Sequence, residues 1–566
     1  MTTHAASTPV APARIVRAAG SLVEASPMQA ALFEIAFVGE RRLLGEVVRQ
    51  RGDVTTLQVY EDTTGLAIGE PVEAANVSLT AQLGPGLLGA VLDGVGRPLA
   101  RVADATGDFI APGARADMLD RDRRWHFDAA RHVGDVVRAG DVLGTVAEGT
   151  MTHHILVPPG VSGTIAALDS GDYRVIDPLG TLTDGTALRL SHAWPVRTPR
   201  PVIERLPSSR PFVTGQRVFD LFFPVAEGGS AAVPGGFGTG KTIIEQSLAK
   251  YAEADVVVYV GCGERGNEMT DVLTEFPELI DPRTGQHVMD RAVLVVNTSN
   301  MPVAAREASI YLGVTIAEYF RDQGQRVALM IDSTSRWAEA LREMGARQQE
   351  MPGEEGYPTY LASRLGQFFE RAGCARVLGT PAREGAVTIL AAISPPSGDF
   401  SEPVTQAALR VTGALWALDP ALAHQRHYPA VDWDTSFSLY ANSVSAWFDE
   451  HGGAGWARMR GELLALLQQE RELRDIAGLV GPDALEDHDH LVMDTAAMVR
   501  EVLLRQNVFN TADAISSPQK TWQMAQAALE TLRAGEAHLA GGKPFAQFDL
   551  VPARRALIAL RDGATV

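Results

Sequence analysis

The sequence is poor in cysteine and contains no long apolar run. Its 566 residues include two cysteines, Cys262 and Cys374, and neither lies in a C-x-x-C or zinc-like spacing. A disulfide framework is therefore not indicated, and a reducing compartment is expected. No segment approaches the roughly 20 apolar residues of a membrane-spanning helix. The N-terminus also lacks the basic segment and apolar run of a secretory signal.

Basic residues are also fewer than acidic residues, which disfavours nucleic acid as a partner. The chain carries 50 Lys and Arg against 69 Asp and Glu, a formal net charge of -19. Proteins that bind nucleic acid need clustered Lys and Arg to displace counterions, so no nucleic-acid partner is expected. The apolar share of 46% and charged share of 21% are typical of a globular protein. The length requires several domains.

The first third of the chain has the pattern of β structure. A flexible tail at 1–12 precedes short β-prone runs at 13–80, which predict an antiparallel barrel. A connector at 81–109 leads to a second β-rich segment at 110–190. His153 and His154 are adjacent there, and adjacent strand residues point to opposite faces. We therefore interpret both histidines as surface residues rather than as a metal site.

The remaining two thirds of the sequence have a different residue pattern. Over 191–438, apolar runs such as 256–260 and 327–331 alternate with helix-length segments. This alternation predicts a parallel sheet covered by helices on both faces. From 439 to 566 the residues Leu, Ala, Glu and Arg dominate and predict a helical domain.

A phosphate-binding loop opens the second of these regions. The pattern G-x-x-x-x-G-K-[ST] is matched over 235–242, after a short apolar run and before a helical stretch, which is the context the motif requires. Backbone N–H groups of such a loop wrap phosphates at the N-terminus of the helix. The residues expected to bind nucleotide here are Gly235, Gly236, Phe237, Gly238, Thr239, Gly240, Lys241 and Thr242. Lys241 is expected to neutralise the β- and γ-phosphates, and Thr242 to hold Mg²⁺.

Two carboxylates follow apolar runs that read as strands. Asp332 ends the run 327–331, and an Asp at that end of a buried strand supports Mg²⁺, usually through water. Glu264 follows the run 256–260 between glycines that allow a sharp turn. This places Glu264 in the crevice above the sheet, where it can polarise an attacking water, and Arg265 could reach the γ-phosphate. The alternative is a Glu–Arg pair on a solvated loop.

Several longer segments carry a family resemblance. They include 60–66, 84–89, 261–269, 332–340 and 394–403, together with the phosphate loop. On these residues the chain resembles the catalytic A subunit (alpha chain) of V/A-type rotary ATPases or ATP synthases. The resemblance implies a multidomain fold: an N-terminal β-barrel, a β-rich insertion, a central α/β P-loop (RecA-like) nucleotide-binding domain and a C-terminal α-helical domain.

The resemblance also implies roles for single residues. Lys241, Glu264 and Asp332 match the phosphate-binding lysine, the catalytic carboxylate and the Walker B aspartate of the family. Arg265 and Arg336 match arginines that line the phosphate side of the site.

Two aromatic residues match the adenine pocket of related catalytic chains. Tyr428 aligns with the ring that stacks on adenine, and Phe509 is similar to the second pocket aromatic. For both, the alternative is a ring of the hydrophobic core. Two loop positions depart from the family, since Gly236 replaces Pro and Thr239 replaces Ser.

The resemblance also implies a cofactor and a set of partner subunits. It implies Mg²⁺ with ATP or ADP, and a hexameric A3B3 ring in which a non-catalytic B subunit lends an arginine in trans. Central and peripheral stalks would connect the ring to a membrane sector that moves protons or sodium, with the complex on the cytoplasmic face of the membrane. Two alternatives stay open: a non-catalytic subunit of the same ring, and a related hexameric motor acting on RNA or on protein export.

Overall fold

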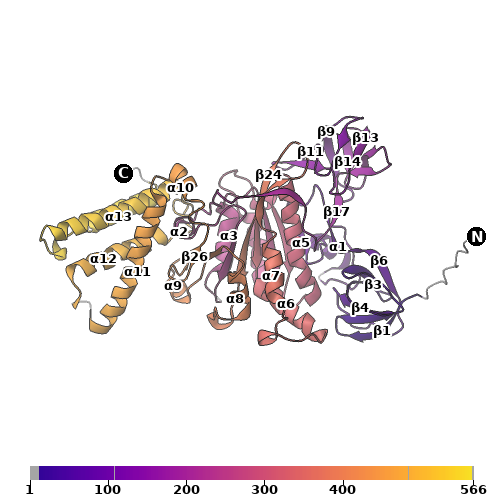
Figure 1. Ribbon diagram of the computed structural model, residues 1–566, viewed down its shortest axis with the longest axis horizontal. Helices are drawn as coiled ribbons and strands as arrows, with labels where there is room; N and C mark the ends of the chain where they lie inside the picture. Colours follow the sequence, from indigo (N-terminus) through magenta and orange to yellow (C-terminus); the bar gives the residue numbers. More distant parts are fainter. Residues whose placement is uncertain (1–11, 108, 237, 482–483, 564–566) are drawn as a thin grey trace, which may run out of the picture.

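The computed structural model describes residues 12–107, 109–236, 238–481 and 484–563 (Figure 1). The tail predicted at 1–12 thus lies, except for its last residue, outside the described residues. The chain runs from β structure at one end, through a central sheet flanked by helices, to a helical bundle at the other end (Figure 1). Within the described ranges, no helix combines the length and the apolar character that crossing a bilayer requires.

The N-terminal strands form one six-stranded antiparallel sheet in the order β1-β2-β5-β4-β3-β6. A bridge between Arg14 and Pro71 joins the two edges, so the sheet closes as a barrel, as predicted. The strands are β1 (Arg14–Ala19), β2 (Leu22–Ser26), β3 (Glu34–Val38), β4 (Leu43–Arg51), β5 (Val54–Val59) and β6 (Val72–Ser78).

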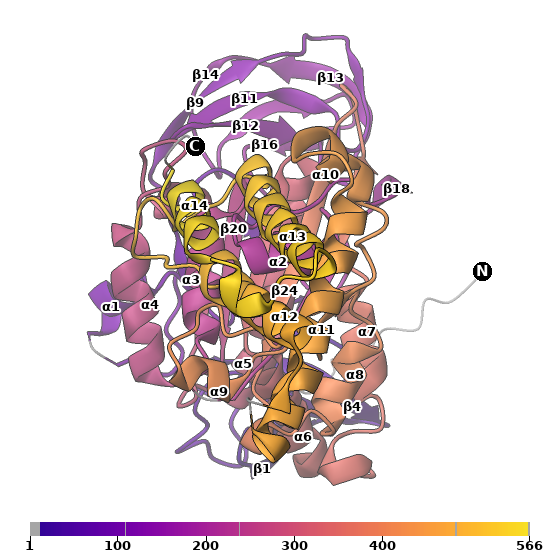
Figure 2. The same cartoon turned by 90° about the vertical axis from the view of Figure 1, so that its left-hand side faces the viewer.

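The second β-rich segment contains two four-stranded sheets, ordered β10-β13-β15-β16 and β12-β11-β9-β14. Both protrude beyond the central sheet (Figure 2). Their strands are β9 (Arg124–Ala129), β10 (Val136–Val137), β11 (Val142–Glu148), β12 (Met151–Leu156), β13 (Gly163–Leu168), β14 (Gly171–Arg174), β15 (Pro178–Leu182) and β16 (Ala187–Arg189).

A ten-stranded sheet forms the centre of the molecule, with the path β26-β25-β19-β24-β22-β20-β21-β8. From β25 to β8 all neighbours are parallel. The edge strand β8 comes from the stretch predicted as a connector. The strands on this path are β8 (Val91–Asp93), β19 (Ser230–Pro234), β20 (Val256–Cys262), β21 (Ala292–Asn297), β22 (Arg326–Asp332), β24 (Glu384–Ile393), β25 (Ala414–Leu415) and β26 (Phe437–Ser438). Off the path, β23 (Gly373–Val377) pairs with β24, and β18 (Val202–Leu206) pairs with β23.

Helices cover both faces of this sheet, as predicted. Alternate residues of β20 belong to different cores: Val258 packs in the cluster that contains α5, whereas Val257 and Tyr259 pack with α3 and α4. This division follows from the two-residue period of a strand. The helices are α3 (Lys241–Tyr251), α4 (Gly266–Glu278), α5 (Val303–Asp322), α6 (Thr334–Arg347) and α7 (Leu361–Phe369).

The prediction that His153 lies on the surface is wrong. His153, on β12, is fully buried, with Nδ1 2.6 Å from the Glu148 carboxylate and Nε2 2.6 Å from the Tyr319 hydroxyl on α5. The neighbouring His154 is half-buried, and its backbone N–H donates to the side chain of Gln323. The two histidines do point to opposite faces of the strand. The prediction failed because α5 covers the face that carries His153, and the strand pattern does not show what packs on that face.

A buried arginine ties the C-terminal helices to the central domain. Arg217, on α2 (Arg217–Phe222), pairs with Asp513 at 2.7 Å and donates to the backbone oxygens of Leu503 and Arg505. Because an unpaired buried charge is costly, this network fixes the segment 505–513 against the central domain. The C-terminal elements are α10 (Ser445–His451), α11 (Trp456–Val480), α12 (Asp487–Met498), the π-helix Val499–Leu504, α13 (Pro518–Ala540) and α14 (Val551–Arg561).

Candidate active site

The phosphate loop links β19 to α3, as the motif requires. Gly238 and Gly240 have φ angles of 75° and 87°, in the left-handed region that favours glycine. At Gly235 a Cβ atom would lie 2.6 Å from the hydroxyl of Thr239, so this close approach also needs glycine. A Cβ atom on Gly236 would meet no atom within 4 Å, and nothing in the structure explains why glycine stands there. Phe237 lies outside the described residues.

Two side chains of the phosphate loop donate hydrogen bonds to the loop's own backbone. Lys241 Nζ donates to the backbone oxygens of Gly235 at 2.6 Å and Gly236 at 3.2 Å. Thr239, which is buried, donates its hydroxyl to the Gly236 oxygen at 2.8 Å. Burial lowers the pKa of Lys241, and the nearby Asp332 carboxylate opposes that shift. The ammonium group therefore lies across the mouth of the loop, held by carbonyl oxygens that a phosphate could replace.

The two predicted carboxylates meet at the carboxyl ends of neighbouring parallel strands. Gly261 of β20 is in register with Asp332 of β22, so Glu264 lies just beyond the residue that faces Asp332. Both carboxylates are buried. Burial and the adjacent Glu264 raise the pKa of Asp332 to about 7, whereas Lys241 lowers it.

Glu264 is held in place by the segment that follows β22. Its Oε1 accepts a 2.8 Å hydrogen bond from the Ser333 hydroxyl and lies 4.0 Å from Arg336 Nε. Burial raises the pKa of Glu264, and these two contacts oppose the rise. With 4% of its surface exposed, Glu264 does not belong to a solvated surface pair.

The two arginines occupy different environments. Arg336, on α6, donates to the Glu339 carboxylate at 2.9 Å, which directs part of its guanidinium away from Glu264. Arg265 is exposed at the residue before α4 begins. Arg336 is thus close to the carboxylates, whereas Arg265 lies at the rim of the site.

Sequence reasoning missed a third carboxylate at this site. Glu245, one turn after Lys241 on α3, is 2% exposed, and its carboxylate faces the Tyr259 hydroxyl of β20. Burial, followed by Asp332 and Glu264, raises its pKa well above the ordinary value. The available signal was an i, i+4 spacing from Lys241, which places both side chains on one face of the helix.

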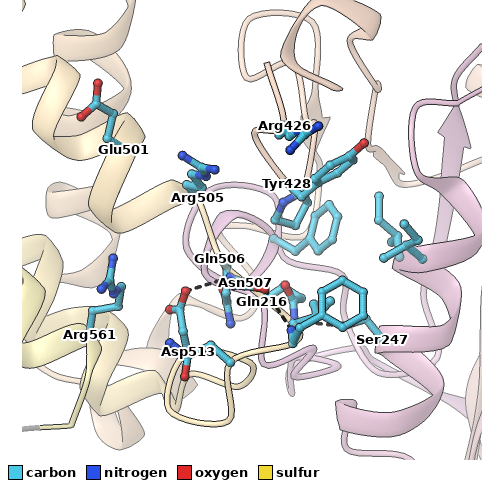
Figure 3. Close-up of a pocket in the computed structure, with 17 residues that line it drawn as sticks. Gln216, Ser247, Arg426, Tyr428, Glu501, Arg505, Gln506, Asn507, Asp513 and Arg561 are labelled. Carbon is cyan, nitrogen blue, oxygen red and sulfur yellow. Dashed lines mark hydrogen bonds between the residues drawn. The ribbon is translucent and has the colours of Figure 1, made fainter. Parts of the chain in front are cut away.

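A pocket of about 700 Å³ lies beside the phosphate loop (Figure 3). Tyr428 lines it and adjoins the loop, since a Cβ on Gly240 would lie 3.0 Å from the Tyr428 ring. Phe509 lines the same pocket and is 87% exposed, so it is not a ring of the core. Ile243 and Ile244 of α3 form a further wall. The pocket therefore joins the start of α3 to the C-terminal segment around Phe509.

Comparisons with known proteins divide the chain among four family models. Residues 15–76 match the beta-barrel domain of the ATP synthase alpha/beta family, and 116–197 match the alpha/beta subunit barrel-sandwich domain. Residues 215–438 match the nucleotide-binding domain of that family, and 445–538 the C-terminal domain of V and A type ATP synthase.

The most informative relatives match nearly the whole chain. The V-type ATP synthase alpha chain of Anaeromyxobacter dehalogenans is 57% identical over 94% of this chain and 92% of its own. A relative from the A-type ATP synthase of Methanospirillum hungatei is 50% identical over 97% of this chain and 94% of its own. This chain belongs to the family of V/A-type ATP synthase alpha chains. These matches confirm the predicted family, the fold class and the identification as part of a P-loop ATPase or ATP synthase.

The fold extends to more distant proteins than the V/A-type alpha chains. The structure of the assembled ATPase EscN from the type III secretion system of enteropathogenic E. coli covers 92% of this chain and 100% of its own, with a TM-score of 0.64 and 22% identity. At that identity the likeness concerns the fold alone.

Proposed function

We propose that this chain makes or hydrolyses ATP in a V/A-type rotary complex, coupled to proton or sodium transport through a separate membrane sector. The observation that carries the proposal is the convergence of Lys241, Glu264 and Asp332 at the carboxyl edge of the sheet beside the phosphate loop. An ammonium group for phosphates and two buried carboxylates for metal and water are the parts that phosphoryl transfer to water requires.

Each residue has one task in this proposal. The loop amides and Lys241 bind the β- and γ-phosphates at the start of α3. Glu264, which Ser333 orients through a hydrogen bond, polarises the attacking water as a general base. Arg265 and Arg336 neutralise charge that develops on the γ-phosphate. Tyr428 and Phe509 stack on the adenine ring in the adjoining pocket.

The same residues fit Mg²⁺. The Thr242 hydroxyl and the Asp332 carboxylate would hold the cation, since Mg²⁺ prefers oxygen ligands. Asp332 is buried beside Glu264 and Glu245, with Lys241 as a nearby cation, so the carboxylates favour an added positive charge. When bound, Mg²⁺ supplies neutralisation of the phosphate charge.

Magnesium-dependent nucleotide binding is expected to weaken by about tenfold as the pH falls from 8 to 6. The reason is that burial and Glu264 raise the pKa of Asp332 to about 7, so the carboxylate that supports the cation is ionised above pH 7 and protonated below it. Titrating ADP in the presence and absence of Mg²⁺ measures the effect. In Asp332→Asn the pH dependence should shrink to the part that titration of the ADP phosphate itself produces, which a titration of ADP with Mg²⁺ in the absence of protein measures. A pH dependence as large as in the unmutated complex would assign the effect to another group.

The ring partners follow from the proposal. A non-catalytic B subunit would alternate with this chain in an A3B3 hexamer and complete the site with an arginine in trans. Central and peripheral stalks would link the ring to the membrane, with the complex on the cytoplasmic face. The exposed position of Arg265 and Phe509 supports a site that a neighbouring subunit completes.

Purification of the intact complex tests this proposal. The chain, tagged and isolated from membranes under mild detergent, should bring with it a B-type subunit, stalk subunits and a membrane ring, and should hydrolyse ATP. Recovery with RNA or with protein-export components would favour the related motors. Recovery in a ring whose hydrolysis does not depend on Lys241 would favour a non-catalytic subunit.

A further inference from the structure

The loop that carries Glu264 is joined to the loop that follows the neighbouring strand, β21. Two backbone hydrogen bonds make this junction. Gly263 N–H donates to the Asn297 oxygen at 2.6 Å. Ser299 N–H donates to the Glu264 oxygen at 2.9 Å. The backbone of Glu264 is therefore held by the segment 297–302, which precedes α5.

One side chain contacts both loops. Arg306, in the first turn of α5, donates from Nη2 to the Ser299 oxygen at 2.9 Å. Its stem lies against Gly263, where a Cβ atom would come within 2.8 Å of Arg306 Cδ and 3.0 Å of Nε. Gly263 has a φ of 74°, so its backbone conformation and this close approach both require glycine. Arg306 thus holds the residue before Glu264 and the residue that bonds to the Glu264 backbone.

The position of Arg306 is electrostatically unfavourable. It is one of five buried arginines in the described residues, and the other four each pair with a carboxylate at 2.6 or 2.7 Å. Those four are Arg200, Arg217, Arg321 and Arg371. Arg306 forms no ion pair within the described part of the chain, and its guanidinium donates to a backbone oxygen instead. A positive charge is also disfavoured near a helix N-terminus. Residues that break such rules without a local gain are expected at functional sites.

We propose that Arg306 is a positioning residue for Glu264, because it clamps the Glu264 loop through Gly263 and Ser299. The inference rests on the proposed function, since it takes Glu264 as the base that activates water. A general base works only within hydrogen-bond reach of its water, and a misplacement of about 1 Å can lower a rate by about 10²-fold. In this proposal Arg306 contacts neither nucleotide nor water, so its removal affects turnover and not binding.

Removal of the Arg306 donors tests the proposal on the assembled complex. Arg306→Met keeps an unbranched apolar stem against Gly263 but cannot bond to Ser299. It should lower the single-turnover rate of ATP hydrolysis by about 10- to 100-fold. The dissociation constant for ATP should change by less than about twofold. Arg306→Lys keeps a cation that can donate to the Ser299 oxygen, and it should recover most of the loss and remain about threefold slower than the unmutated complex.

A double-mutant cycle with Glu264→Gln decides whether Arg306 acts through Glu264. Without the carboxylate there is no base left to position, so adding Arg306→Met to Glu264→Gln should lower the rate by less than about twofold. If the two losses multiply instead, Arg306 acts independently of Glu264, on the fold or on the phosphates, and the inference is overturned. A large loss of ATP affinity in Arg306→Met would overturn it as well.

Arg321 provides the matched comparison. It is a buried arginine at the other end of the same helix, α5, and it pairs with Asp322 at 2.7 Å. Arg321→Met makes the same chemical change away from the Glu264 loop. Any loss of rate that it causes should therefore be equal with and without Glu264→Gln.

Arg306→Lys decides the question if Arg306→Met does not assemble. Its loss of about threefold should be present alone and absent when combined with Glu264→Gln, and any other pattern contradicts the proposal. If Glu264→Gln itself keeps the unmutated rate, the proposed role of Glu264 fails and this inference fails with it. If Glu264→Gln is slow but the losses multiply, this inference fails while the proposed function stands.

Discussion

Replacing Glu264 with Gln is expected to reduce ATP turnover by about 10²- to 10⁴-fold, the range that a general base contributes. Nucleotide binding should change little, because glutamine has the same shape and its oxygen can still accept the hydrogen bond from Ser333. What is lost is the negative charge that, in the proposed function, polarises the attacking water. Steady-state hydrolysis by the assembled complex, with nucleotide affinity measured in parallel, checks both parts.

A matched control lies on the helix that follows. Glu278, at the far end of α4, is exposed, and Glu278→Gln makes the same chemical change away from the phosphate loop. Its turnover should equal that of the unmutated complex. If Glu264→Gln retained the unmutated rate within the assembled complex, another group would have to activate the water.

Replacing Lys241 with Ala is expected to weaken ATP binding by about 10- to 100-fold, since a hydrogen bond to a charged group contributes about 1.5–3 kcal/mol. Turnover should fall by a further 10²- to 10³-fold, about the cost of removing one donor from a charge-stabilising site. In the structure the Lys241 ammonium lies against the Gly235 and Gly236 oxygens, so its removal takes a positive charge from the loop itself.

Lys250 provides the comparison for this variant. It lies on the same helix, α3, in the last turn, where its ammonium packs over the Tyr251 ring. Lys250→Ala should therefore leave both affinity and turnover close to the unmutated values. Unchanged hydrolysis in Lys241→Ala would indicate that this chain is a non-catalytic member of its ring.

The sequence by itself determined the parts of the site that are local. The spacing of the glycines before Lys241 specifies a tight loop at a helix N-terminus, because only that backbone places several N–H groups around a phosphate. Asp332 and Glu264 could be assigned to one edge because the carboxyl ends of parallel strands meet there. The register of Gly261 with Asp332 agrees with that assignment.

The tertiary structure alone decided which faces are covered and which distant segments meet. His153 is buried because α5 packs on a strand face that its own pattern left open. The side-chain amide of Gln216 donates a hydrogen bond to the backbone oxygen of Ala514, 298 positions later in the sequence. The ion pair of the adjacent Arg217 with Asp513 fixes that C-terminal segment beside it. A local pattern records the period of a helix or strand but not what packs against it. The pocket beside Tyr428 is lined by α3 and by segments near residues 426–429 and 501–513, so it could be recognised only in the folded chain.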